Sequence, residues 1–138
     1  MAEKIRLRLV TPTRMLLDEE VDEVAAPGAL GEFGVLPNHI SFLTLLEIGE
    51  MSYRQGANRY YLALSSGYAE VLDNVMTVLA NAAEYADEID VERAQKAREN
   101  AQRTIEELNR EDREFLATEA ALRRALVRLQ VASKEARK

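Results

Sequence analysis

The stretch Ile89-Asp90-Val91-Glu92-Arg93-Ala94 marks the point at which this chain changes character. All six glycines and all three prolines of the 138-residue chain precede residue 68. Glycine and proline make turns and break helices, so their loss predicts a turn-rich segment followed by an uninterrupted helical one. The sequence therefore predicts an α+β protein with two domains, which cover residues 1–86 and 87–138.

The front segment has the sequence pattern of a β-sandwich. Ile5, Leu7 and Leu9 alternate with charged residues, which is typical of a strand with one buried face. Turn residues punctuate the segment further on, notably at 55–58 (QGAN) and at 73–74 (DN). Short strands separated by turns at this spacing favour an antiparallel sandwich.

The tail carries apolar side chains every three or four residues, which is the period of one helix face. One such series runs through residues 91–108, and a second through 115–129 includes Leu126. A polar break at 109–112 (NRED) separates them and predicts an antiparallel helical hairpin in which Asp112 starts the second helix. Because its seam is rich in alanine, which buries little apolar area, we expect the hairpin to open readily.

Composition and charge exclude several classes of function. The chain has no cysteine, so disulfides, thiolate metal sites and cysteine catalysis are excluded. Residues 1–87 hold 13 acidic and 6 basic residues, a net charge of −7 that argues against nucleic acid as a partner, whereas residues 88–138 carry +1. No apolar run approaches the roughly 18 residues of a membrane-spanning helix, and no signal sequence is recognisable, so we expect no direct membrane insertion.

No set of residues has the spacing of a catalytic or metal-binding site. His39 is the only histidine, which excludes a histidine pair for a metal ion and leaves turn stabilisation as its simplest role. The glycines at 28, 31 and 34 are not followed by the Lys-Ser/Thr of a phosphate-binding loop, so they suit tight turns. We therefore expect neither an enzyme nor a metal site.

Three blocks of sequence carry a family resemblance. They are residues 31–39 (GEFGVLPNH), residues 66–80 (SGYAEVLDNVMTVLA) and residues 89–94 (IDVERA). With these blocks in order along both halves, the chain resembles the epsilon subunit of bacterial F-type ATP synthases. Ser66 departs from the pattern, because a glycine is common at that position in the family.

The resemblance implies a rotor subunit without catalytic activity of its own. In the family, a ten-stranded sandwich docks on the gamma subunit and on the c-ring within the central stalk, during proton-gradient-driven ATP synthesis. The helical hairpin inhibits ATP hydrolysis by reaching the beta and alpha catalytic subunits, and in some members it binds regulatory ATP. The complex places such a subunit at the cytoplasmic face of the bacterial cell membrane as a peripheral component. A free-standing ATP-binding sensor is the alternative function.

The resemblance also implies a nucleotide site between the hairpin and the sandwich, with no obligatory cofactor. Its expected residues are Glu84, Ile89, Asp90, Arg93, Ala94, Arg124 and Arg128. Arginines near both ends of this set suit phosphate oxygens, since guanidinium groups bind them bidentately. Asp90 has a simpler role open to it, as the residue that caps the first tail helix. Asn100 stands where tight-binding members carry a further arginine, which predicts weaker ATP binding.

Four further residues are expected at partner interfaces. By resemblance, Glu32 faces the c-ring, His39 the gamma subunit, and Arg123 and Lys134 the catalytic subunits. Each has a simpler alternative: a solvated carboxylate for Glu32, a turn-stabilising side chain for His39, and a solvated basic face for the tail residues.

Overall fold

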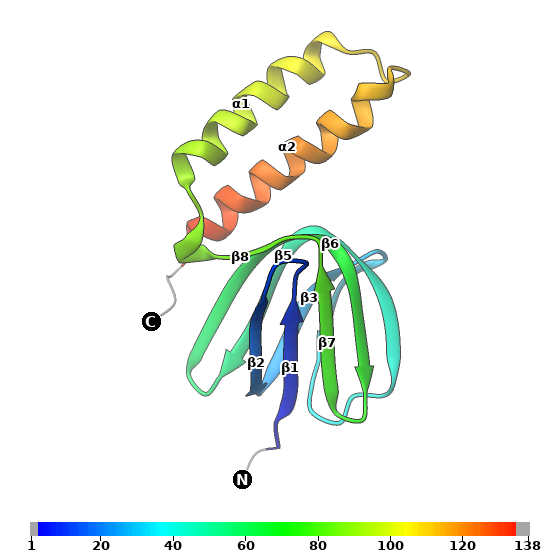
Figure 1. Cartoon of the computed structure of the whole chain (residues 1–138), viewed down its shortest axis with the longest axis vertical. Coiled ribbons are helices and arrows are strands. Elements are labelled where there is room, and N and C mark those ends of the chain that lie inside the picture. The colour runs from blue at the N-terminus through cyan, green and yellow to red at the C-terminus, as the bar shows by residue number, and fades with distance from the viewer. Residues whose placement is uncertain (1–2, 135–138) are drawn as a thin grey trace.

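The computed structural model describes residues 3–134 as a β-sandwich that carries a docked helical hairpin (Figure 1). The strands are β1 (Ile5–Val10), β2 (Met15–Val21), β3 (Glu23–Gly28), β4 (Gly31–Val35), β5 (Phe42–Gln55), β6 (Asn58–Leu72), β7 (Val75–Ala80) and β8 (Ala83–Tyr85). A short 3₁₀ helix, η1 (Ala86–Glu88), leads to α1 (Val91–Glu107) and α2 (Arg113–Ala132). The predicted α+β class, a sandwich followed by a two-helix hairpin, is confirmed.

The structure has eight strands in residues 3–134, whereas the family resemblance led us to expect about ten. The reason lies in β5 and β6, which are 14 and 15 residues long and curve over the sandwich from one layer to the other (Figure 1). At the corner of β6, Ser66 and Gly67 have φ angles of 62° and 148°. Each of the two long strands therefore contributes to both layers and replaces two short ones.

The strands follow the order β2-β1-β7-β6-β5-β3-β4, with β8 paired to β6. All pairs are antiparallel except β1 with β7. Ile5, Leu7 and Leu9 are fully buried, as their alternation predicted, and pack in one core with Met76 and Val78 of β7. Burial of this continuous apolar face provides the main driving force for folding the sandwich.

Both predicted turns occur at strand junctions. Gln55 pairs with Asn58, so β5 and β6 are joined by a two-residue loop, in which Gly56 has a φ of 63°. Asp73 and Asn74 join β6 to β7 with φ angles of 51° and 62°. Two successive positive φ angles are typical of the type I′ turn, whose twist matches that of a tight hairpin. Apart from glycine, asparagine and aspartate are the residues that tolerate such angles best.

The most deeply buried side chains of the hairpin seam are alanines, as the alanine-rich pattern predicted. Ala94 and Ala101 of α1 and Ala125 of α2 are buried. Leu126 was wrongly placed on the seam: its side chain is 46% exposed. Neighbouring helical residues point about 100° apart, so the burial of Ala125 turns Leu126 toward solvent.

The polar break between the helices is held by a hydrogen bond within the loop. Asp112 is the N-cap residue of α2, as predicted, but its carboxylate accepts a hydrogen bond from the backbone N–H of Asn109 at 2.7 Å. No backbone N–H of the first turn of α2 bonds to it. Asp112 therefore fixes the interhelical loop and leaves the start of α2 without a side-chain cap.

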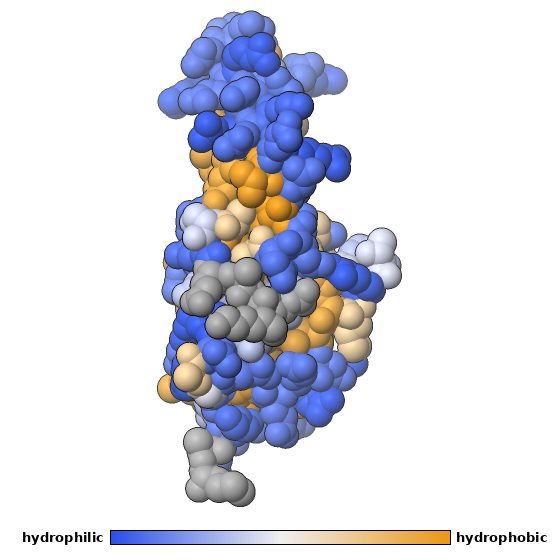
Figure 2. Space-filling view, turned by 90° about the vertical axis from the view of Figure 1, so that its left-hand side faces the viewer, coloured by the Kyte–Doolittle hydropathy of each residue, from blue (hydrophilic) through white to orange (hydrophobic). Residues whose placement is uncertain are grey.

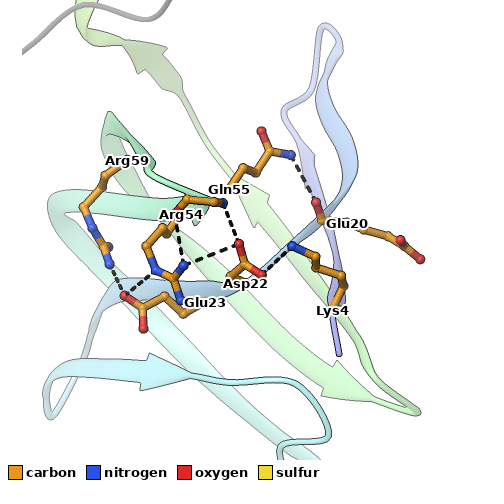
Figure 3. Close-up of polar contacts among 8 residues, drawn as sticks. Lys4, Glu20, Asp22, Glu23, Arg54, Gln55 and Arg59 are labelled. Atoms are coloured by element: carbon orange, nitrogen blue, oxygen red, sulfur yellow. Dashed lines mark hydrogen bonds and ion pairs between the residues drawn. The ribbon is translucent and has the colours of Figure 1, made fainter. Parts of the chain in front are cut away.

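The sandwich end opposite the hairpin is closed by a cluster of charged side chains (Figure 3). Asp22, which is only 8% exposed, accepts hydrogen bonds from Lys4 Nζ at 2.5 Å and from Gly56 N at 2.6 Å. Arg54 lies 3.5 Å from the same carboxylate and also contacts Glu23. The bond from Lys4 and that from the Gly56 N–H hold the pKa of Asp22 below its ordinary value, against the opposing effect of burial.

Candidate functional site

A cleft of about 390 Å³ lies between the hairpin and the sandwich. Six of its lining residues are alanines, drawn from both domains, so its walls are smooth and largely apolar. Its charged lining residues are Glu84 of β8 and Arg124 and Arg128 of α2. A narrow apolar slot edged by arginines has the chemistry to hold a flat ring together with an anionic group.

Arg128 and Glu84 face each other across this cleft. Arg128 donates from Nε to Glu84 Oε1 at 2.7 Å and from Nη2 to Glu84 Oε2 at 3.2 Å. Arg124 also lines the cleft but has no ion-pair partner within residues 3–134. The closed cleft thus contains one neutralised arginine and one arginine that is available to an anion.

The other four residues expected at the nucleotide site do not line the cleft. Asp90 accepts a hydrogen bond from the backbone N–H of Arg93 at 3.0 Å and caps α1. Ile89 and Ala94 are buried in packing, and Arg93 is exposed. The structure therefore brings together Glu84, Arg124 and Arg128, and it gives residues 89–94 the role of a helix start.

α2 attaches the hairpin to the sandwich through its last turns. Val131 is fully buried in a small apolar cluster with Ala63, Ala86 and Ile89. Lys134, expected at a partner interface, lies 3.8 Å from Glu50 Oε1 and 5.2 Å from the centre of the Tyr61 ring. In this state the Lys134 side chain is directed to the sandwich. Arg123, by contrast, is exposed.

The two partner residues expected on the sandwich lie in different surroundings. Glu32 is exposed on β4, next to the turn between β3 and β4. His39 Nδ1 lies 2.8 Å from the carbonyl oxygen of Ile40, and its ring packs edge-to-face on Phe42 at 5.7 Å. The hydrogen bond agrees with the turn-stabilising alternative.

An apolar row on the sandwich was missed by the sequence reasoning. Leu45, Tyr68 and Leu79 are cross-strand neighbours on β5, β6 and β7, and they are 55%, 54% and 50% exposed. Val10 of β1 pairs with Leu79 and continues the row. A cavity of about 570 Å³ opens beside it. The signal was present in residues 42–46 (FLTLL), where apolar side chains lie on both faces of one strand.

The described residues show neither a membrane-spanning helix nor a metal-binding cluster. No helix within residues 3–134 is long and apolar enough to cross a membrane. Those residues also contain no group of three histidine or carboxylate side chains arranged to hold a metal ion.

A sandwich with an exposed apolar row, joined to a hairpin that closes over an arginine-edged cleft, defines a class of two-domain interaction proteins. Two family models match in succession: "ATP synthase, Delta/Epsilon chain, beta-sandwich domain" over residues 4–86 and "ATP synthase, Delta/Epsilon chain, long alpha-helix domain" over residues 87–133. The chain belongs to the ATP synthase epsilon chain family, as the sequence blocks predicted.

Curated relatives and solved structures agree with this membership. The ATP synthase epsilon chains of Geobacter sulfurreducens and Geotalea daltonii are each 54% identical over 138 residues, with complete coverage of both chains. A chain in the mitochondrial ATP synthase of Euglena gracilis, solved as an OSCP/F1/c-ring assembly, is 27% identical with a TM-score of 0.76, covering 87% of this chain and 76% of that one. A chain from the central stalk and c-ring of Tetrahymena thermophila shares the fold at 15% identity, with a TM-score of 0.58 and 95% coverage of both chains.

Proposed function

We propose that this protein is a non-catalytic central-stalk subunit that joins the gamma subunit to the c-ring during proton-driven ATP synthesis. Family membership over the whole chain supports this role. So does the origin of the Euglena gracilis neighbour, an F1/c-ring assembly. In a bacterium the protein would then be peripheral, held at the cytoplasmic face of the membrane by its partners and involved in ion transport only through the complex.

The exposed apolar row of Leu45, Tyr68 and Leu79 is the observation that carries the docking function. Contiguous apolar side chains on a sheet face cost solvation energy and typically mark a protein interface. We assign this row to the gamma subunit, and the exposed carboxylate of Glu32 to the polar loops of the c-ring. His39 lies beside Phe42 at the start of β5, the strand that carries Leu45, so we keep it with the gamma-facing surface.

Co-purification with gamma tests this assignment. The combined change Tyr68→Ser and Leu79→Ser should abolish recovery of the gamma–epsilon complex, because the apolar contact area is removed. Leu116→Ser is the matched control, since Leu116 is exposed on α2 away from the row. Recovery of gamma unchanged by the double substitution would contradict the docking face. Glu32→Ala, assayed for c-ring association, tests the second contact separately.

We further propose that ATP binds in the cleft between the domains. The alanine walls suit the adenine ring, and Arg124, together with Arg128, suits the phosphates. The pairing of Arg128 with Glu84 and the asparagine at 100 both favour weak binding. Bound ATP would favour the closed hairpin by its higher affinity for that state, which would make the tail a sensor of cellular ATP.

Calorimetric titration with ATP, with and without magnesium, tests the nucleotide site. Arg124→Ala should weaken binding about tenfold or more, because a charge-assisted phosphate contact is lost. Arg123→Ala, one residue away but outside the cleft, should leave the affinity unchanged, and so should Arg93→Ala. No binding up to millimolar ATP in the unmodified protein would refute the site and leave the stalk function standing.

Restraint of ATP hydrolysis is the third part of the proposal. In the open state, α2 would extend toward the catalytic subunits, where Arg123, Arg124, Arg128 and Lys134 meet acidic side chains. The limited attachment of the hairpin supports such opening, since only the end of α2 and the linker join the apolar cluster on the sandwich. A free-standing ATP sensor remains the second candidate on the strength of the cleft alone, and failure to co-purify with gamma would favour it.

A further inference from the structure

We propose that the Arg128–Glu84 pair is an ionic latch that closes the hairpin without any nucleotide. The proposal rests on the hairpin mobility proposed above and concerns how its closed state is held. The apolar contact at the junction is limited: its buried members are Ala63, Ala86, Ile89 and Val131, and Tyr61 and Val127 are only partly buried against them. Figure 2 shows the hydrophobic surface gathered at the base of the hairpin, while its far end is hydrophilic. Polar contacts across the same junction add to this apolar packing, and the pair of Arg128 with Glu84 is the shortest of them.

The latch pair has the geometry of a strong contact. The guanidinium of Arg128 meets both carboxylate oxygens of Glu84, at 2.7 and 3.2 Å, across a sequence separation of 44 residues. Both side chains are largely shielded from solvent, with exposed fractions of 24% and 33%. Two parallel bonds to a carboxylate fix orientation as well as distance, so the pair specifies how α2 sits on β8.

The carboxylate of Glu84 also takes the place that an anion would fill beside Arg128. An arginine at a cleft edge needs a counter-charge when the cleft closes, because closure removes water from it. Glu84 supplies that charge from within the chain. The charge of Arg128 is thereby neutralised in the closed state without a ligand. A bound nucleotide would stabilise the closed state further through its contact with Arg124.

A second contact strengthens the same end of α2. Glu50 of β5 accepts a hydrogen bond from Gln130 Nε2 at 3.4 Å and lies 3.8 Å from Lys134 Nζ. These longer contacts are weaker than the bidentate pair, and they are open to solvent and salt. The latch is therefore centred on Arg128, with Glu50 as a secondary anchor.

The absence of cysteine permits a direct measurement in the full-length protein. Cysteines introduced by Ala57→Cys in the β5–β6 loop and Ala117→Cys on α2, both exposed positions, accept a fluorophore pair whose energy transfer reports opening. Without nucleotide, Glu84→Gln should raise the ratio of open to closed hairpin about three- to tenfold, because a shielded bidentate pair is lost. Glu92→Gln removes the same charge from an exposed site on α1 and should have no effect.

Charge reversal completes the test. The double variant Glu84→Arg with Arg128→Glu should return the ratio toward that of the unmodified protein, whereas either single reversal should open the hairpin. Equal ratios in Glu84→Gln and Glu92→Gln, an unmodified protein that is mainly open, or a double variant that stays open would each overturn the latch. Calorimetric titration of the same protein with ATP reports separately on the nucleotide site: no heat of binding would refute that site and leave the latch intact.

Discussion

Arg98 places its Nε atom in the hairpin interior without a hydrogen-bond partner among residues 3–134. It follows Ala94 by four residues and precedes Ala101 by three, so it lies on the seam face of α1. Leaving a buried donor unsatisfied costs about 1 to 3 kcal/mol. Arg98 therefore works against formation of the hairpin and favours its opening.

Arg98→Met should raise the free energy of hairpin opening by about 1 kcal/mol, because the orphaned donor is removed and an apolar side chain replaces it. Hydrogen exchange of the α1 and α2 amides measures the change. Arg103→Met is the control, since Arg103 is exposed and bonds to Asn100 on the same helix. Equal protection in both variants would argue that the Arg98 donor carries no cost.

Ser66 holds a backbone conformation that favours glycine, with a φ of 62° at the corner of β6. Ser66→Gly should stabilise the sandwich by about 0.5 to 1 kcal/mol, because it removes that strain. Thermal unfolding measures this gain as a higher melting temperature. Gly67→Ala should do the opposite, since a Cβ at residue 67 would lie 2.0 Å from the carbonyl oxygen of Leu79. A lower melting temperature in Ser66→Gly would show that its hydrogen bond with Asn81 outweighs the strain.

Asp22 gives the stability of the sandwich a dependence on acid pH. The pKa of Asp22 is lowered in the folded protein, so its contribution is fully present above the ordinary aspartate pKa, near 4. That contribution is lost as the pH falls from about 4 through the lower folded pKa. Asp22→Asn should therefore reduce stability at pH 7 and make the unfolding free energy flatter in this acid range. Urea unfolding at a series of pH values measures this pH dependence of the unfolding free energy. If Asp22→Asn left the dependence below about pH 4 unchanged, the role of the Lys4 contact would be contradicted.

At the scale of one helix, the N-cap residue Asp90 stabilises the first turn of α1. Asp90→Ala should lower the protection of amides in the first turns of α1 by about 1 kcal/mol, because the N–H of Arg93 loses its acceptor. Asp112→Ala should have a smaller effect on α2, where no side-chain cap exists. If Asp90→Ala also abolished ATP binding with α1 protection unchanged, the residue would be a ligand and not a cap.

Much of each element could be predicted from the sequence, whereas the assembly of the cleft could not. The alternation around Leu7 and the alanine period of the tail reflect local geometry, so they identified strand and helices correctly. The membership of the cleft depends on how α2 rotates and docks, which no local pattern encodes. Arg124 and Arg128 face the cleft because Val131 and Ala125 are buried, whereas Arg93 points outward beyond the cap of α1.

The whole molecule divides into a sandwich with its own core and a hairpin that attaches to it mainly through the end of α2. A version of the chain that ends after Glu88 keeps every strand of the sandwich and the apolar row. Assembled into the synthase, it should retain association with gamma but lose the restraint of ATP hydrolysis several-fold, because no helix can reach the catalytic subunits. Hydrolysis rates of membranes containing each form measure this effect. A truncated form that inhibits as strongly as the full chain would place the restraint in the sandwich.

The attachment of the hairpin through the far end of α2 has a consequence for biosynthesis. The last strand ends at Tyr85, but the side chains that secure the hairpin, from Arg128 to Lys134, are translated more than 40 residues later. At roughly 5 to 20 residues per second, the sandwich emerges from the ribosome a few seconds before its own helices are able to cover it. If the sandwich folds in that interval, the apolar row that we assign to gamma is exposed with no closed arm beside it, so docking on gamma would precede closure of the hairpin.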